Sequence, residues 1–364
     1  MNYRSLCCLA VLLYWLETST QAQVIVFVPG KTTPYLSLAT VATLAGAADR
    51  KGLTDGSGDA AEFARPMGVA VTADGLIYVA DADSHTIRKI TAAGVVTTVA
   101  GAPGRKGSTD GVGAAARFYY PVGVAVDAGG TLYLTDADNH TIRKIAAAGD
   151  VSTVVGMPGS KGSTDGPGAT ARFNRPSGVA VDATGTLYVA DTFNHTIRKV
   201  TPAGVVTTWA GVAGHKGSTD GPGAVARFYH PAAVAIDAQG ALYVADNGNQ
   251  TIRKITPSGM VTTLAGTAGR SGSADGEGAS ARFHFPVGVA VDARGNVYVA
   301  DHFNATIRQI TAAGRVSTLA GTVLHLGHID GPGPEARFDG PASIAVDASG
   351  TLYVTDGTTI RVIK

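Results

Sequence analysis

The sequence is poor in cysteine, glutamate and charge. Both cysteines of the 364-residue chain, Cys7 and Cys8, lie within its first eight residues. The rest of the chain therefore offers neither a disulfide framework nor a thiol nucleophile. Glutamate occurs at only four positions: Glu17, Glu62, Glu277 and Glu335. Charged residues make up 16% of the sequence and the net charge is +1, a balance that gives no general attraction to nucleic acid or to an anionic membrane.

Long apolar runs are also missing. The apolar run at residues 6–16 follows Arg4 and precedes a polar stretch that ends at Ala22. It is too short to cross a bilayer and has the layout of a secretory signal. We expect residues 1–22 to be a signal peptide cleaved near Ala22, with an uncleaved anchor as the alternative, and residues 23–40 to be a linker. The expected location is then secreted or periplasmic, without a membrane span.

Glycine is abundant, with 48 residues, and most of the chain consists of copies of one unit. The unit is clearest at residues 176–231, and each copy opens with a proline. The opening prolines are Pro66, Pro121, Pro176, Pro231, Pro286 and Pro341, always 55 residues apart. A strict period of this length indicates a propeller, a solenoid or another repeat array.

Each copy reads as four short strands. In the third copy these are residues 178–181, 187–190, 196–200 and 205–210, rich in β-branched residues and separated by turns such as the Asp-Ala-Thr-Gly stretch at 182–185. Four antiparallel strands make one propeller blade. The sequence therefore predicts an all-β fold, a six-bladed β-propeller of four-stranded antiparallel blades.

The two ends of the chain predict how the ring closes. The last copy stops after its third strand, at residues 360–363, and residues 41–46 align with the fourth strand of the first copy at 96–101. We expect strand 41–46 to complete the last blade, because this pairing removes two exposed edges. Residues 41–364 would then form one domain, and we expect a monomer.

The blade resembles the NHL repeat. The third copy reads Tyr188-Val-Ala-Asp191-Thr-Phe-Asn194-His195-Thr-Ile-Arg198-Lys. All six copies keep the tyrosine and the aspartate, at 78, 133, 188, 243, 298 and 353 and at 81, 136, 191, 246, 301 and 356. The resemblance covers residues 41–364 and implies a six-bladed propeller similar to secreted bacterial NHL proteins and to the teneurin NHL domain. It implies no single activity, because NHL-like propellers include adhesive modules, RNA binders and an amidating lyase, and the related gluconolactonase-like propellers are hydrolases.

An aspartate recurs in the long connection before each opening proline. The six positions are Asp55, Asp110, Asp165, Asp220, Asp275 and Asp330. Calcium loops are one interpretation, but the ligand spacing of an EF-hand is absent. An aspartate before a short alanine-rich run is typical of a helix N-cap. We therefore favour capping and local ion pairs, with a phenylalanine of the same segment, such as Phe228, anchored in the core.

Two other repeated residues suggest metal sites. His85, His140 and His195 are 55 residues apart and invite a zinc hypothesis. They belong to hairpins of successive blades, set back from the axis, so we favour hydrogen bonds within each hairpin. The aspartates that end the innermost strands also begin Asp-Ala-x-Gly turns, and we favour the turn over a ring of cation ligands. These aspartates are Asp127, Asp182, Asp237, Asp292 and Asp347.

The positions that vary lie just before each proline. The second-to-third-strand hairpins and the long connections share one face of the predicted ring, where function is usually found. The residues before the prolines enter the innermost strands at the mouth of the channel. We identify as candidate ligand-binding residues Arg65, Tyr119, Tyr120, Arg175, Tyr229, His230, His284 and Asp339.

These observations favour a non-catalytic binding module. We expect a protein, peptide or glycan ligand at the long-loop face and no nucleic-acid partner. The alternative is a metal-dependent hydrolase or lyase of the gluconolactonase-like or amidating-lyase-like type. No residue is assigned a catalytic or metal-binding role, because the inner strands carry mostly Gly, Val and Ala and no serine lies in a nucleophile-elbow motif. No cofactor is expected, and a central divalent metal remains an open alternative.

Overall fold

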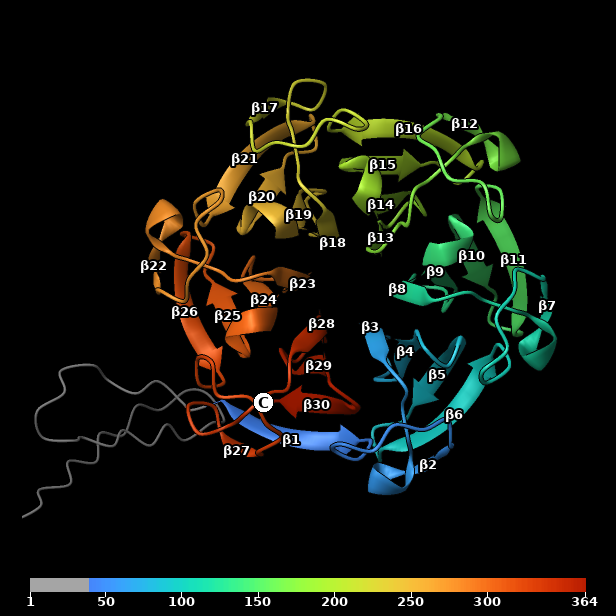
Figure 1. Cartoon of the computed structure of the whole chain (residues 1–364), viewed down its shortest axis with the longest axis horizontal. Helices are drawn as coiled ribbons and strands as arrows, with labels where there is room; N and C mark the ends of the chain where they lie inside the picture. Colours follow the sequence, from blue (N-terminus) through green and yellow to red (C-terminus); the bar gives the residue numbers. More distant parts are fainter. Residues whose placement is uncertain (1–38) are drawn as a thin grey trace, which may run out of the picture. The chain divides into compact units, whose positions relative to one another are not determined.

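The computed structural model describes residues 39–364, which form six antiparallel sheets in a ring around a central axis (Figure 1). The predicted signal peptide and nearly all of the predicted linker lie outside the described residues. Within the described part of the chain, no helix has the length and apolarity that a membrane span requires. The prediction of a six-bladed all-β propeller is confirmed.

The strands of each blade follow the chain outward from the axis. The innermost strands are β3 (Pro66–Val71), β8 (Pro121–Val126), β13 (Val179–Val181), β18 (Pro231–Ile236), β23 (Pro286–Val291) and β28 (Pro341–Val346). The second strands are β4 (Ile77–Asp81), β9 (Leu132–Asp136), β14 (Leu187–Asp191), β19 (Leu242–Asp246), β24 (Val297–Asp301) and β29 (Leu352–Asp356). The third strands are β5 (Thr86–Ile90), β10 (Thr141–Ile145), β15 (Thr196–Val200), β20 (Thr251–Ile255), β25 (Thr306–Ile310) and β30 (Thr359–Ile363).

The outer part of each blade holds one strand more than the sequence predicted. The fourth strands are β6 (Val95–Ala100), β11 (Asp150–Val155), β16 (Val205–Ala210), β21 (Met260–Ala265), β26 (Arg315–Ala320) and β1 (Thr40–Ala45). Two-residue fifth strands pair with them: β2 (Gly56–Ser57), β7 (Gly111–Val112), β12 (Gly166–Pro167), β17 (Gly221–Pro222), β22 (Gly276–Glu277) and β27 (Gly331–Pro332). Each fifth strand belongs to the long connection that leads from the preceding blade into its own blade. It covers the outer edge of the fourth strand, which would otherwise be open to pairing.

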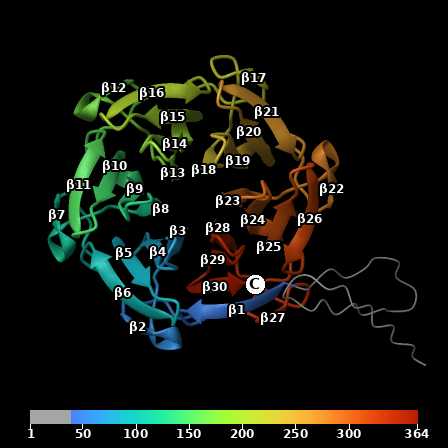
Figure 2. The ribbon, with the colours of Figure 1, turned by 180° about the vertical axis from the view of Figure 1, so that it is seen from behind.

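The ring closes as predicted, through the N-terminal strand. β1 lies between β27 and β30, with Val41 opposite Ile363 and Ala45 opposite Ile360. Both views of the ribbon show β1 beside the C-terminal strand (Figure 2). The strand spans Thr40–Ala45 where residues 41–46 were predicted. Val41 and Ala45 are buried, so the last blade completes its core with residues from the other end of the chain.

Short 3₁₀ turns occupy two recurring places. Four lie in the hairpins between second and third strands: η3 (Ala137–Asn139), η5 (Thr192–Asn194), η6 (Asn247–Asn249) and η8 (His302–Asn304). Four follow fifth strands: η1 (Gly58–Ala60), η2 (Gly113–Ala115), η4 (Gly168–Thr170) and η7 (Gly278–Ser280). No side chain caps the N-terminus of any of these turns.

A buried arginine joins each long connection to its blade. Arg198 Nη1 lies 2.7 Å from Asp191 Oδ2, and Arg198 Nη2 lies 2.6 Å from Asp165 Oδ1. The guanidinium also stacks 5.1 Å from the ring centroid of the buried Phe173. Asp165 accepts two further bonds from the backbone and hydroxyl of Thr208. All six blades repeat this arrangement, which confirms the predicted ion pairs and shows that the N-cap prediction was wrong.

The carboxylates of these clusters are stabilised in different ways. Asp191 is fully buried, and burial raises its pKa to about 6, although the Arg198 charge and hydrogen bonds from Asn174 and Asn194 oppose the rise.

The aspartates that end the innermost strands are turn residues, as predicted: Asp182 Oδ1 accepts the backbone N–H groups of Thr184 and Thr186. The repeated polar residues of the blade thus hold its loops and strands together.

Candidate functional site

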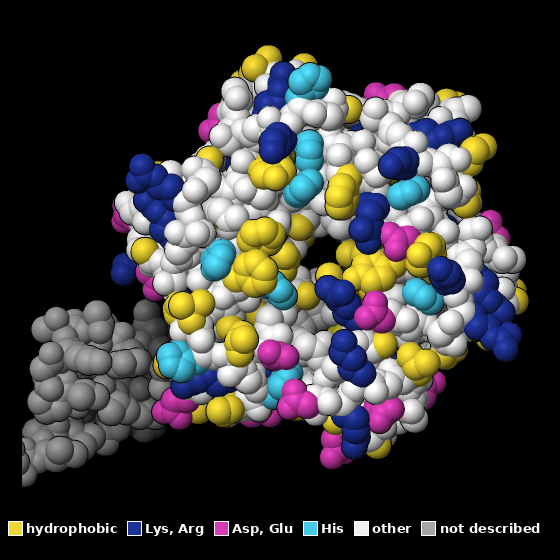
Figure 3. Space-filling view, in the orientation of Figure 1, with side chains coloured by type: hydrophobic (Ala, Val, Ile, Leu, Met, Phe, Trp, Pro, Cys, Tyr) yellow, Lys and Arg dark blue, Asp and Glu magenta, His cyan; other side chains and the backbone are white. Residues whose placement is uncertain are grey.

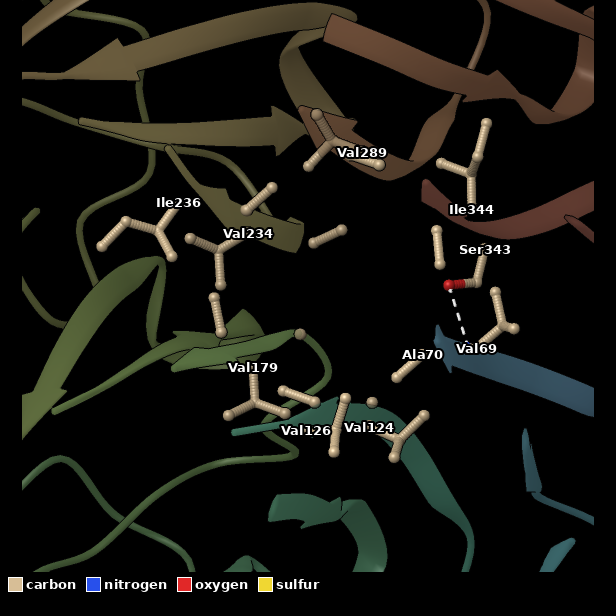
Figure 4. A pocket seen from close by; sticks show the side chains of 18 of the residues that line it. Val69, Ala70, Val124, Val126, Val179, Val234, Ile236, Val289, Ser343 and Ile344 are labelled. Carbon is tan, nitrogen blue, oxygen red and sulfur yellow. Dashed lines mark hydrogen bonds between the residues drawn. The ribbon is translucent and has the colours of Figure 1, made fainter. Parts of the chain in front are cut away.

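The central channel is lined by small aliphatic residues. A cavity of about 230 Å³ runs between the six innermost strands, with Val69, Val124, Val179, Val234, Val289 and Ile344 around it (Figure 4). Ser343 supplies a hydroxyl, which accepts a long hydrogen bond of 3.4 Å from the Val69 backbone N–H. No His, Asp or Glu is among the residues that line this cavity. The channel wall therefore offers no ligand set for a central metal ion.

The polar and aromatic side chains gather instead at the long-loop mouth of the channel. A hollow of about 830 Å³ lies there, and it is lined from five blades. Figure 3 shows this face, with hydrophobic side chains on either side of the central opening and charged and histidine side chains around them. Three phenylalanines of the hollow keep large exposed fractions: Phe193 46%, Phe285 38% and Phe303 47%. Exposed aromatic rings at the edge of a hollow are typical of a recognition surface.

Three of the predicted residues line this hollow directly: Arg65, His230 and Asp339. Two more, Tyr120 and Arg175, are stacked into the same surface. The guanidinium groups of Arg65 and Arg175 each lie 5.8 Å from the ring centroid of Tyr120. Arg175 also lies 5.6 Å from the Phe193 ring, which lies 5.1 Å from the His230 ring. Side chains of four successive blades thus form one contiguous row.

Arg175 is held in place by an ion pair. Its Nε lies 2.8 Å from Oδ1 of Asp138 in the second blade. Asp138 belongs to η3, so the pair crosses from one blade to the next. Exposed ion pairs contribute little to stability, but this one fixes the orientation of the guanidinium between Tyr120 and Phe193.

The remaining predicted residues, Tyr119, Tyr229 and His284, are not among those that line the hollow. Each lies one residue farther from the proline, and its backbone N–H donates to the buried aspartate of its own blade. The Tyr119 and Tyr229 rings contact lysines, with Lys106 Nζ 4.5 Å and Lys216 Nζ 4.7 Å from the ring centroids. His284 lies 5.1 Å from the Phe303 ring. These side chains support the rim of the hollow.

The repeated histidines accept hydrogen bonds from the backbone of residues at the mouth. The residues just before the prolines have left-handed φ in five blades: 59° at Tyr120, 48° at Arg175, 49° at His230, 58° at Phe285 and 89° at Gly340. The Nδ1 atoms of His85, His140 and His195 accept the backbone N–H of the first three, at 3.3, 3.1 and 3.3 Å. Gln250 Oε1 accepts that of Phe285 at 2.6 Å.

These contacts correct the prediction that each histidine bonds within its own hairpin. The partner is on the next blade, so each histidine joins two blades and holds a residue of the mouth in an unfavourable backbone conformation. Where the hairpin ends in Ala305 and offers no acceptor, the residue held is Gly340, which adopts left-handed φ readily. The histidines are thus structural groups that support the candidate site.

The sequence analysis did not single out every residue of the hollow, and two of the missed residues lie together. Asp49 and His328 line it beside Asp339, and the three side chains bring ligand atoms within 4.8 Å of one another. Both missed residues break the repeat: Asp49 stands where the second copy has Gly104, and His328 where it has Ser108. Departure from the repeat was the signal that could have found them.

Comparison with known proteins agrees with this architecture. The NHL repeat matches residues 63–90, 118–145, 173–200, 228–255 and 283–310. Protein SUPPRESSOR OF QUENCHING 1 of Arabidopsis thaliana is 31% identical over 282 residues, which are 73% of this chain and 26% of that protein. The chain therefore spans about a quarter of the length of this relative.

Two solved structures from Bacteroides thetaiotaomicron share the fold. One is a protein of unknown function, with a TM-score of 0.70 and 25% sequence identity; the similarity covers 89% of this chain and 75% of that protein's chain. An auxiliary nutrient binding protein has a TM-score of 0.67 at 16% identity, covering 90% and 76%. Together with the repeat match and the six blades, these similarities show that the chain is an NHL-repeat six-bladed β-propeller.

Proposed function

We propose that this chain is a secreted or periplasmic, non-catalytic binding module that takes a protein, peptide or glycan ligand at its long-loop mouth. The observation that carries the proposal is the hollow of about 830 Å³ with three exposed phenylalanines at its edge. Aromatic rings provide apolar contact area at low entropic cost. Arg65 and Asp339 supply groups of opposite charge in the same hollow, which would orient a ligand that carries polar groups.

The metal-dependent hydrolase or lyase remains the alternative, and the site supports it less. Such chemistry usually needs carboxylates or histidines that converge on an ion in the channel. The described channel wall carries valine, alanine, glycine, isoleucine and one serine instead. The mouth suits recognition, because the side chains from Arg65 to His230 already stack on one another without a ligand.

The test is a binding screen of the purified chain against a glycan array and a peptide library, with and without changes at the mouth. The variant carries Phe193→Ser, Phe285→Ser and Phe303→Ser. The matched control carries Val112→Ser and Val225→Ser, which remove exposed apolar side chains from the long connections at the periphery. We expect a ligand that binds the wild type and the control but loses at least about tenfold in affinity with the mouth variant, equivalent to 1.4 kcal/mol. Equal binding by all three would reject the mouth as the site, and turnover of a lactone or ester panel would favour the alternative.

A further inference from the structure

His328 occupies a place that no other histidine of the repeat shares. The equivalent positions hold serine in four copies: Ser108, Ser163, Ser218 and Ser273. The sixth blade also has a hairpin two residues shorter than the fifth, so it lacks the asparagine that binds the buried aspartate in the second to fifth blades. In the third blade, for example, Asn194 Nδ2 donates to Asp191 Oδ2 over 2.7 Å. His328 turns its Nδ1 toward the corresponding Asp356 Oδ2, at 3.6 Å.

The other ring nitrogen of His328 faces the hollow. Its Nε2 lies 3.6 Å from Asp339 Oδ2, while the side chain as a whole is only 9% exposed. Both distances exceed that of a hydrogen bond, and Nδ1 has no hydrogen-bond partner within residues 39–364. A largely buried imidazole whose Nδ1 lacks a hydrogen-bond partner is unusual, because buried polar atoms are nearly always satisfied.

Gly357 leaves the space that this arrangement needs. A Cβ atom at this position would lie 3.3 Å from both Asp339 Oδ2 and His328 Nε2, and 2.9 Å from the Cε1 atom of the ring. The shortened hairpin thus opens a small space between the two side chains. Asp339 itself is 45% exposed, so this space communicates with the hollow.

A third ligand atom comes from the start of the ring. Asp49 lies in the connection that leads from β1 into the first blade, and its φ of 59° is left-handed. Four other copies have glycine at this position, where left-handed φ costs less: Gly104, Gly159, Gly214 and Gly269. Ligand atoms of Asp49, His328 and Asp339 all lie within 4.8 Å of one another, at the seam between the sixth and first blades.

We propose that Asp49, His328 and Asp339 bind a divalent transition-metal ion, Zn²⁺ in the first instance. Imidazole nitrogens and carboxylate oxygens are both zinc ligands, whereas Ca²⁺ and Mg²⁺ prefer oxygen ligands alone. Metal-bound histidines usually direct their second ring nitrogen at a carboxylate that fixes the ring, and Asp356 stands in that place. Three protein ligands leave a fourth position that faces the hollow, where water or a ligand group would bind.

This metal site goes beyond the proposed ligand-binding function and does not depend on it. Its residues come from the seam, and of these only Asp339 is also used in the proposed ligand-binding function, whereas the exposed phenylalanines belong to the third and fifth blades. A metal ion here would link two long loops, the one that leads into the first blade and the one that leads into the sixth. We therefore expect the ion to stabilise the closed ring as well.

The experiment is a titration of the purified, tag-free full chain with Zn²⁺ after treatment with a chelator. Calorimetry should show one ion bound per chain, and the melting temperature should rise with Zn²⁺ but not with equal Ca²⁺ or Mg²⁺. Asp339→Asn and Asp49→Asn should each weaken Zn²⁺ binding at least about tenfold. The matched control is Asp83→Asn, an exposed aspartate in the first-blade hairpin on the same face, which should bind Zn²⁺ as the wild type does.

Both aspartates are exposed, so neither substitution should unfold the ring, and the melting temperature of each metal-free variant verifies this. The proposal is overturned if the wild type shows no saturable Zn²⁺ binding, or if both variants bind Zn²⁺ as tightly as the control. In either case His328 would be a space-filling replacement for the missing asparagine. Neither outcome bears on the phenylalanine variant that tests the ligand-binding function.

Discussion

The backbone N–H of Arg175 donates to Nδ1 of His140 over 3.1 Å, although the two residues belong to successive blades. The bond holds Arg175 at a φ of 48°, a conformation that a long side chain rarely adopts. The repeated histidine therefore holds the backbone of a residue at the mouth of the channel. The residue that it supports, Arg175, places its side chain in the proposed ligand-binding surface.

The first prediction concerns this support. His140→Ala removes the acceptor and leaves the Arg175 N–H unpaired in a strained backbone, so we expect a loss of about 1–2 kcal/mol in the free energy of unfolding. His140→Gln should restore most of it, because Gln250 performs the same role toward Phe285. Urea unfolding of the three proteins measures the difference. Equal stability of the alanine variant and the wild type would show that the contact contributes nothing.

The same histidines predict a dependence of stability on pH. Burial lowers the pKa of His140 below its ordinary value of 6.5, with Arg175 and Lys161 adding to the effect and Asp138 opposing it. Burial also lowers the pKa of His195, helped by His230 and Lys216. The folded chain then binds fewer protons than the unfolded chain, so this stabilisation is present above pH 6.5 and is lost as the pH falls through the lowered values.

We therefore expect these two histidines to lower the melting temperature at pH 5 relative to pH 7.5. Buried aspartates such as Asp191, whose pKa is raised, act in the opposite direction, so the contribution of the histidines is measured as a difference between two proteins. Relative to its own value at pH 7.5, the melting temperature at pH 5 should be higher for a chain carrying His140→Gln and His195→Gln than for the wild type, because glutamine does not titrate. Differential scanning calorimetry at the two pH values measures both changes, and an identical change in the two proteins would assign the pH dependence to other groups.

The period of the sequence was sufficient to predict the blades. It placed the third and fourth strands of the third blade at 196–200 and 205–210, the bounds of β15 and β16. It also predicted the closing strand to within one residue. These strands are specified locally, by β-branched residues and turn glycines, and every copy repeats them. The fifth strands escaped prediction because two residues such as Gly166 and Pro167 carry no periodicity.

The contacts of the mouth could not be derived in the same way. His140 and Arg175 are 35 residues apart, and only the packing of one blade against the next brings them together. The ion pair between Asp138 and Arg175 has the same origin. Asp49 and His328 meet only where the ring closes, 279 residues apart in the chain. The sequence repeat therefore predicts the strands and turns within each blade, but it does not predict the side-chain contacts between neighbouring blades.

The buried arginine clusters lead to a third prediction. Asp191 is wholly buried against Arg198, whereas the Asp165 side chain is 47% exposed. Asp191→Ala should cost about 3–5 kcal/mol, because it leaves a buried guanidinium without its inner partner. Asp165→Ala should cost less, about 1.5–3 kcal/mol, since water can replace part of the lost pairing. Chemical denaturation of both variants checks this order, and a larger loss for Asp165→Ala would contradict it.

Calcium addition tests whether the recurring aspartates of the long connections, such as Asp165, bind calcium or only form ion pairs and hydrogen bonds. Both oxygens of Asp165 already accept hydrogen bonds from Arg198 or Thr208. A calcium ion would have to displace these groups, so we expect no change in melting temperature in millimolar Ca²⁺. A rise that disappears in Asp165→Ala and Asp220→Ala together would restore the calcium hypothesis for these connections.

The closing strand gives the last prediction. Removing residues 1–45 takes β1 from between β27 and β30 and exposes both edges, along with the core contacts of Val41 and Ala45. We expect this truncation to lower the melting temperature sharply and to promote aggregation, because unpaired edges recruit other strands. The matched control removes residues 1–22 alone, the predicted signal, and should melt as the longer chain does. An unchanged melting temperature would mean that the sixth blade is stable without β1, and that the ring does not depend on joining its two ends.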